Sequence, residues 1–356
     1  MTELNYPAEH LSLTPLAYAN GRPELMAIIR QQPADFRVEE ILGFEPEGEG
    51  EHVFLWVEKT ALNTQQVADA LAKLANVAAR QVSFSGMKDK NAITRQWFSV
   101  HLPGADNIDW QAINSPQIKL LTSTRHLRKL RRGVHRGNRF VITARNLQGA
   151  TDSLTQRIAA ITGTGVPNYF GEQRFGFDGA NLRKAQQWFA GEFKPKRHQQ
   201  GIYLSAARSW LFNQLLSQRV ANQQWNKLLG GELLMLAGSH SVFPQDDDPE
   251  LAQRLLDGDI HLTGPLYGKP GQGNKHCQQQ VAVLEQALFD SYPQLLAGLE
   301  KAGLKAERRA LRLIPENFEY QLDADVLECR FSLTSGCFAT AVMRELLNYQ
   351  VAGREA

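Results

Sequence analysis

Cysteine is scarce in this sequence: Cys277, Cys329 and Cys337 are the only three among 356 residues. So few cysteines, in an odd number, exclude a disulfide framework and are typical of a reducing compartment, so we expect a cytoplasmic protein. Long hydrophobic runs are also missing, because no stretch approaches the roughly 18 apolar residues of a membrane span. The start, MTELNYPAEH, lacks both the basic and the apolar part of a secretory signal. We therefore expect no export and no membrane contact.

Motifs for nucleotide and metal cofactors are absent as well. The nearest approach to a phosphate-binding loop is Gly268 with Gly273, and Asn274 stands where that loop needs lysine. There is no Gly-x-Ser-x-Gly elbow and no His-Glu-x-x-His pair, and the cysteines lack the spacing of a zinc site. The acidic run 246–248 is explained as a loop ahead of a helix that begins with proline. We therefore expect neither a metal nor a cofactor.

The overall composition is that of a globular protein. Apolar residues make up 43% and charged residues 21% of the chain, which excludes wholesale disorder. A chain of this length exceeds one ordinary core, so two domains are expected. The formal net charge of +2 says nothing about partners until its distribution is considered.

Acidic residues are missing from Trp110 to Thr151, and this absence is informative. Those 42 residues carry nine lysines and arginines, seven of them between Arg125 and Arg139. A field of one sign attracts a polyanion, although a solvated basic face without a partner is the simpler alternative. The complete exclusion of acids favours nucleic acid. The candidate contacts to an RNA backbone are Arg125, Arg128, Lys129, Arg131, Arg132 and Arg136.

The first 145 residues read mainly as strands. Alternating or short apolar runs indicate them, and one helix, which Asn63 or Thr64 can cap, interrupts the series. The predicted strands are Phe36–Glu39, His52–Val57, Gln81–Ser85, Gln96–Leu102 and Arg139–Ala144.

Helical periodicity dominates from about residue 152 to residue 310. Ser205 can cap a long helix there, and Pro293 marks a break within 281–299. Strand character returns at 327–333, before a final helix at about 339–349. Strand-rich ends around a helix-rich middle predict one domain inserted into another, with two tandem domains as the alternative.

One short segment carries a candidate catalytic group. Asp89 lies in the segment 86–96, GMKDKNAITRQ, between a strand that ends near Ser85 and one that begins near Gln96. Lysines on both sides keep this carboxylate ionised, which suits a nucleophile or a general base better than a general acid. The alternative is a surface turn whose aspartate only pairs with its neighbours.

Together with other blocks, this segment resembles the signature of the TruD family of tRNA pseudouridine synthases. The shared pattern is Gly-x-Lys-Asp-Lys-x-Ala-x-Thr-x-Gln, and a second block is 168–176, NYFGEQRFG. Further blocks are Lys59 with Asn63-Thr64, the run 208–213, and Phe338-Ala339-Thr340. They extend from about residue 30 to residue 345 in the family's order, so the resemblance covers almost the whole chain.

The resemblance implies an enzyme that isomerises uridine to pseudouridine in tRNA, by family analogy at position 13, and it implies no protein partner. Asp89 matches the family's essential aspartate. The reaction breaks the C1′–N1 bond, rotates the uracil and rejoins it through C5 without an external cofactor. Three roles of the carboxylate are open: attack on C1′, addition to the uracil ring, or action as a base at C2′. Each requires the base to leave its stack.

Five further residues match positions that the family uses around the substrate. Phe36, Phe140 and Phe338 are implied as aromatic surfaces for a flipped uracil, although each phenylalanine taken alone is more often a core residue. Asn138 is implied as a substrate contact, because its amide can read a uracil carbonyl and N3–H together. Arg30, where relatives often carry lysine, is implied as a partner of the catalytic carboxylate.

The expected fold class is α+β. We expect a pseudouridine synthase catalytic domain with a mixed, largely antiparallel sheet from residues 1–160 and 311–356, and an inserted helix-rich α/β TRUD domain at 161–310. The competing hypothesis is an RNA-binding or RNA-chaperone protein that has this scaffold but no turnover. Asp89 favours the enzyme, because a protein that only binds RNA could lose this residue freely.

Overall fold

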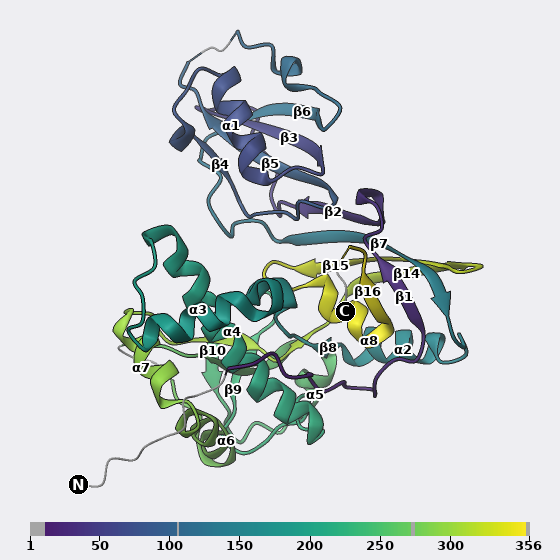
Figure 1. The fold of residues 1–356 in the computed structure, drawn as a ribbon, viewed down its shortest axis with the longest axis vertical. Coiled ribbons are helices and arrows are strands. Elements are labelled where there is room, and N and C mark those ends of the chain that lie inside the picture. Colours follow the sequence, from purple (N-terminus) through teal and green to yellow (C-terminus); the bar gives the residue numbers. More distant parts are fainter. Residues whose placement is uncertain (1–10, 105–106, 272–274, 354–356) are drawn as a thin grey trace. The chain divides into compact units, whose positions relative to one another are not determined.

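The chain divides into two compact units. The computed structural model describes residues 11–104, 107–271 and 275–353. One unit, here called the sheet unit, consists of Pro23–Leu154, Pro315–Ala339 and Leu346–Ala356. The other, here called the helical unit, consists of Met1–Arg22, Thr155–Ile314 and Thr340–Glu345. Figure 1 shows both units coloured along the sequence.

A ten-stranded sheet forms the sheet unit. Its strands are β1 (Met26–Ile29), β2 (Phe36–Ile41), β3 (His52–Thr60), β4 (Val82–Phe84), β5 (Ile93–His101), β6 (Ile118–His126), β7 (Gly137–Gln148), β14 (Glu316–Asp323), β15 (Val326–Thr334) and β16 (Asn348–Val351). The main path runs β14-β15-β7-β2-β5-β3-β6, while β1 pairs with both β16 and β7, and β4 pairs with β5. Two pairings are parallel, β1 with β16 and β2 with β5, and the others are antiparallel. This sheet confirms the expected α+β class.

The long strand β7 joins segments that are far apart in the sequence. It pairs with β2 and β1 from the start of the chain and with β15 from its end. At its first residue, Gly137, a side chain would collide with the backbone carbonyl of Leu333, so glycine there allows β7 and β15 to pair closely. Residues from both ends of the sequence therefore share one sheet.

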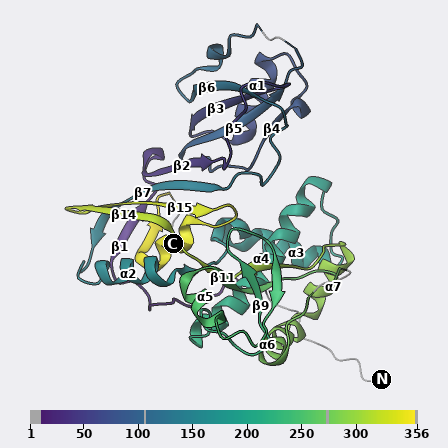
Figure 2. The same ribbon diagram turned by 180° about the vertical axis from the view of Figure 1, so that it is seen from behind.

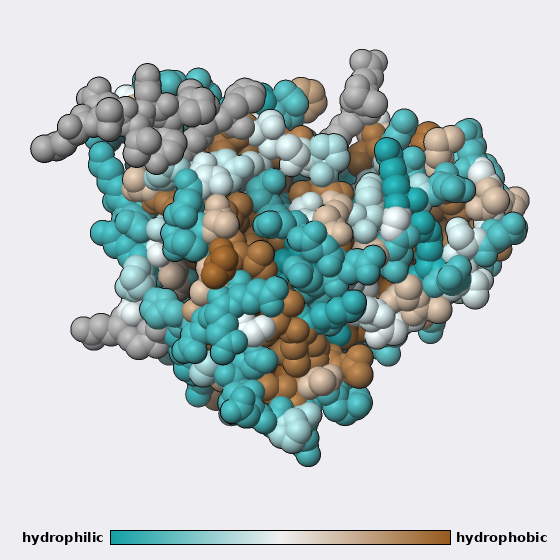
Figure 3. Space-filling model, turned by 90° about the horizontal axis from the view of Figure 1, so that it is seen from below, coloured by the Kyte–Doolittle hydropathy of each residue, from teal (hydrophilic) through white to brown (hydrophobic). Residues whose placement is uncertain are grey.

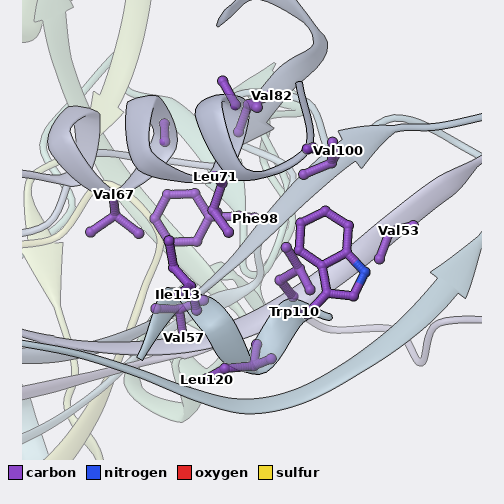
Figure 4. Close-up of a cluster of buried hydrophobic side chains, with 14 of the residues drawn as sticks. Val53, Val57, Val67, Leu71, Val82, Phe98, Val100, Trp110, Ile113 and Leu120 are labelled. Carbon is purple, nitrogen blue, oxygen red and sulfur yellow. The ribbon is translucent and has the colours of Figure 1, made fainter. Parts of the chain in front are cut away.

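A single helix, α1 (Thr64–Leu74), covers the β3–β5–β6 part of the sheet (Figure 1). It begins at the predicted cap, where the backbone N–H of Asn63 donates to the side-chain oxygen Oε1 of Gln66 at 2.9 Å. Val67 and Leu71 on its inner face are fully buried against Phe98 and the other apolar side chains in Figure 4. This core holds β3, α1, β4 and β5 together, and the loop between β4 and β5 carries Asp89.

The helical unit contains most of the remaining helices and two small sheets. The helices are α2 (Leu154–Thr164), α3 (Ala180–Phe189), α4 (Arg197–Ala221), α5 (Leu251–Asp257), α6 (Gln279–Asp290) and α7 (Pro293–Lys301). The strands are β8 (Val166–Pro167), β9 (Leu233–Leu236), β10 (Val242–Pro244), β11 (Ile260–Leu266), β12 (Glu307–Ala310) and β13 (Arg312–Leu313). One sheet has the order β10-β9-β11-β12 and the other pairs β13 with β8. Figure 2 shows α3 beside α4, against which it packs.

Two helix boundaries differ from the sequence prediction. The predicted cap at Ser205 is wrong, because α4 begins at Arg197 and the Ser205 hydroxyl instead accepts a hydrogen bond from Arg174 at 2.8 Å. Residues 197–201 are polar or glycine, so the apolar period does not reveal this first turn. The final helix, α8 (Ala339–Leu346), ends earlier than predicted because β16 follows and pairs with β1. The predicted break at Pro293 is confirmed, since α7 begins there.

The surface in Figure 3 is mainly hydrophilic, with separate hydrophobic patches between the polar side chains. Among the described residues, no helix combines the length and the apolar character that crossing a bilayer requires.

Candidate active site

Asp89 lies in the loop between β4 and β5, at the strand-end position that the sequence predicts. Its side chain is about 30% exposed, and one carboxylate oxygen, Oδ2, accepts a hydrogen bond from Arg30 Nη2 at 3.1 Å. The lysine before it does not serve as its counter-ion. Lys88 instead forms an almost fully buried ion pair with Glu40 at 2.7 Å, and Lys90 is exposed. The cation that holds the Asp89 carboxylate thus comes from a residue 59 positions earlier in the chain.

Arg30 follows the last residue of β1 and has an unusual backbone. Its φ of +61° lies in the left-handed region, which costs a residue other than glycine roughly 1 kcal/mol or more. The guanidinium carbon lies 3.8 Å from the centre of the Phe36 ring, a cation–π contact on one face of that ring. The strained backbone and the aromatic support together direct the guanidinium toward Asp89.

Hydrogen bonds from three elements anchor the backbone of the loop. The hydroxyl of Thr64, at the start of α1, accepts from the Lys88 amide at 2.9 Å. Gln96 of β5 donates to the Gly86 carbonyl at 3.1 Å. Lys59 of β3 donates from its amine to the Asp89 carbonyl at 2.8 Å. The position of Asp89 is therefore fixed before any substrate arrives.

Glu40 is a buried acid whose role the sequence reasoning missed. It accepts hydrogen bonds from the Ser85 hydroxyl (2.5 Å), Lys88 (2.7 Å) and the Trp97 amide (3.3 Å). Three donors satisfy this carboxylate, which offsets the cost of burying it. The sequence of β2 indicates a buried position there, because Glu40 continues the every-second-residue pattern of the buried Phe36 and Val38.

Asn138 lies on β7 directly opposite Glu40 of β2. It is only 9% exposed, and among the described residues its amide oxygen Oδ1 has no hydrogen-bond partner. Buried acceptors in folded proteins are nearly always satisfied, so this oxygen calls for a donor such as an ordered water or a ligand.

The three candidate stacking phenylalanines differ in accessibility. Phe36 and Phe140 are 2% and 7% exposed and contact each other edge to face, with ring centres 6.2 Å apart. Phe140 also packs against Phe331 at 5.7 Å. Phe338 is only half-buried. Of the three, Phe338 presents the most surface to a ligand, while Phe36 and Phe140 belong to the packed aromatic row of the sheet unit.

The candidate RNA-backbone residues divide into two groups. Arg125 is used internally, because its guanidinium donates to the carbonyls of Gly50 (2.8 Å) and Leu102 (3.2 Å). Arg128, Lys129, Arg131, Arg132 and Arg136 are exposed in the loop between β6 and β7.

Acids from other segments neutralise part of this acid-free stretch. Arg139 pairs with Glu39 of β2 at 3.2 Å, and Arg145 pairs with Asp35 at 2.9 Å. The remaining positive charge is therefore concentrated in the loop 127–136, which the sequence alone did not distinguish from the strands beside it.

No group of three or more histidine, cysteine, aspartate or glutamate side chains in the described parts of the chain is arranged to hold a metal ion.

Comparison with known proteins identifies relatives over nearly the full length. A family model described as tRNA pseudouridine synthase D (TruD) matches residues 13–184 and 180–346. A tRNA pseudouridine synthase D from Hydrogenovibrio crunogenus is 45% identical over 343 residues, which covers 96% of this chain and 98% of the relative. A protein of the same name from Aeromonas hydrophila is 46% identical over 341 residues, 96% of each chain. The crystal structure of a putative tRNA pseudouridine synthase D from Methanosarcina mazei shares the fold, with a TM-score of 0.69 at 20% identity over 93% of this chain and 95% of that one.

Proposed function

The chain belongs to the TruD family of tRNA pseudouridine synthases, and from this premise we propose that it isomerises uridine 13 of tRNA with Asp89 as the catalytic carboxylate. The observation that carries the proposal is the fixed, partly exposed Asp89 side chain, held by Arg30 at 3.1 Å on a loop anchored from three elements. A merely structural turn residue needs no such support.

The isomerisation of uridine can be carried out by a single carboxylate and needs no redox partner. Isomerisation breaks C1′–N1, forms C1′–C5, moves a proton onto N1 and releases the hydrogen of C5, so the composition of the base is unchanged. An ionised carboxylate can act as nucleophile or base in such a sequence. Arg30 orients this carboxylate, and the same cation is suited to stabilise negative charge that develops on the substrate.

Two further residues of the sheet unit suit a flipped uracil. The unpaired Oδ1 of Asn138 is an acceptor for the uracil N3–H, and the half-buried Phe338 is a surface on which the ring can stack. Exposed cations in the loop 127–136, among them Arg128 and Arg131, suit the phosphates of tRNA without reading its sequence.

The domain organisation belongs to the same proposal. Residues 1–160 and 311–356 would form the catalytic domain and 161–310 an inserted TRUD domain. Support comes from β7 and β15, which pair although they lie on either side of the proposed insertion. The cysteines, none of which forms a disulfide within the described residues, support a site of action in the cytoplasm.

The test is release of tritium from tRNA that carries 5-tritiated uridine, because that label leaves when C5 becomes the glycosidic carbon. We expect the wild-type protein to release it, and Asp89→Asn to bind tRNA normally without release. The exposed Asp69 on α1 provides a matched control, since Asp69→Asn should leave turnover unchanged. Residual activity of Asp89→Asn above about a hundredth of wild type, a barrier increase under roughly 2.7 kcal/mol, contradicts the assignment.

A further inference from the structure

Lys59 of β3 is a buried lysine with an uncommon partner. Its side chain is completely buried, and its amine donates one hydrogen bond, to the backbone carbonyl of Asp89 at 2.8 Å. The Asp89 carboxylate pairs with Arg30, and within the described residues Lys59 has no ion-pair partner. A buried ammonium normally has a carboxylate beside it, because burial of an unpaired charge is costly.

The charge balance around Lys59 makes this position unfavourable for a cation. Burial lowers the pKa of Lys59 to about 8; the nearby Asp89 opposes this shift and Lys88 adds to it. The Lys88 charge is itself matched by Glu40. The amine can donate to a carbonyl both as ammonium and as neutral amine, so the bond to Asp89 does not depend on which form is present. A methionine would fill the same space without this cost but could not donate.

Lys59 and Thr64 form hydrogen bonds with the backbone of two adjacent residues of the loop. Thr64 accepts from the Lys88 amide at 2.9 Å, and Lys59 donates to the carbonyl of the next residue, Asp89. Both anchors come from β3 and the start of α1, which the packed core holds in place. The position of the Asp89 backbone is thereby set independently of Arg30, which contacts the side chain.

We propose that Lys59 is a positioning residue that holds the Asp89 backbone so that the carboxylate meets its substrate in a reactive geometry. Its amine is bonded to a backbone carbonyl and has no exposed surface, so it acts through Asp89 and not on the substrate itself. The inference rests on the proposed function, because it concerns the rate of the step that Asp89 performs. A misplacement of about 1 Å is sufficient to slow such a step by about a hundredfold.

The experiment is single-turnover tritium release with excess enzyme over labelled tRNA, comparing wild type with Lys59→Met. At saturating enzyme the rate constant reports the chemical step, whereas the stoichiometry of a tRNA-binding titration reports the fraction of folded protein. We expect the rate constant to fall by about tenfold or more, with an unchanged binding stoichiometry and a Kd for tRNA within about twofold of wild type. Lys73→Met, which removes an exposed lysine of α1, is the matched control and should keep the wild-type rate constant.

A lower binding stoichiometry at the wild-type rate constant overturns the inference, because it is the result expected of a purely structural lysine. A fall of the rate constant smaller than about tenfold overturns it as well. If Lys59→Met does not fold, the same two criteria are applied to Lys59→Leu, whose side chain likewise cannot donate to the carbonyl. The proposed function fails separately, when the wild-type protein itself releases no tritium.

Discussion

Replacing Lys59 by methionine should make the protein more stable at neutral pH while making it less active. Burial lowers the pKa of Lys59 from its ordinary 10.5 to about 8. One pKa unit corresponds to about 1.4 kcal/mol, so the buried charge costs the folded state at most about 3.5 kcal/mol. Methionine removes that cost. It also removes the hydrogen bond to the Asp89 carbonyl, and leaving this acceptor unpaired costs about 1–3 kcal/mol. The net expectation at pH 7 is a gain of about 0.5–2.5 kcal/mol.

The stability difference between Lys59→Met and wild type should depend on pH in a defined direction. Between about pH 8 and pH 10.5 the unfolded wild-type chain binds more protons at Lys59 than the folded chain does, so wild-type stability rises with pH across this window. Lys59→Met lacks this contribution. Its advantage should therefore be complete below pH 8, shrink as the pH rises toward 10.5, and reverse above that pH, where only the missing hydrogen bond remains.

Urea unfolding followed by circular dichroism at pH 7 and pH 10 measures the effect. Other groups that titrate in this range contribute equally to both proteins and cancel in the difference. Lys73→Met, which removes an exposed lysine of the same unit, should show no difference that depends on pH. A variant that is less stable than wild type at pH 7, or whose difference from wild type is the same at both pH values, refutes the reasoning about the buried charge.

Two further predictions concern RNA. Arg128→Ala combined with Arg131→Ala should weaken tRNA binding and lower the slope of log affinity against log salt by about 0.7–0.9 for each phosphate that the loop no longer binds, with kcat unchanged; an unchanged slope would place this loop away from the RNA. Phe338→Ala should lose about 1–3 kcal/mol of base stacking, measured as kcat/KM, at little cost in stability. Phe140→Ala should instead lose about 3–5 kcal/mol of folding stability, because its ring is packed between Phe36 and Phe331. If a urea titration showed instead that Phe338→Ala is the less stable of the two variants, Phe338 would be the core residue and Phe140 the stacking surface.

The elements that the sequence predicts well are those with a strong local signal. The helix start at Asn63 or Thr64, the strand at 327–333 and the break at Pro293 depend on side chains within a few positions. All three are confirmed, with Asn63 as the cap. The first turn of α4 and the end of α8 were missed because packing decides them: α3 packs against α4, and β16 needs β1 as its partner. Sequence periodicity carries no record of such partners.

The candidate site shows the same limit more sharply. The motif identified Asp89 and suggested its neighbouring lysines as partners, yet in the fold Lys88 pairs with Glu40. The groups that hold Asp89 are Arg30 and Lys59, which lie 59 and 30 residues away in the chain. Strand pairing brings these residues together, so single-sequence reasoning could name them only through the resemblance to a family, and it assigned no role to Lys59.

Three features near Asp89 each work against folding. Arg30 is the only cationic residue with a positive φ in the described chain, Lys59 is a buried amine without a counter-ion, and the Asn138 oxygen is a buried acceptor without a donor. Arg30 and Lys59 both donate hydrogen bonds to Asp89, and Asn138 lies opposite Glu40, which pairs with the lysine next to Asp89. Costs of this kind persist where the surrounding structure imposes them, and functional sites are one such place. A surface turn at Asp89 would need neither the left-handed backbone of Arg30 nor the buried amine of Lys59, so both features support the catalytic role that we propose for this carboxylate.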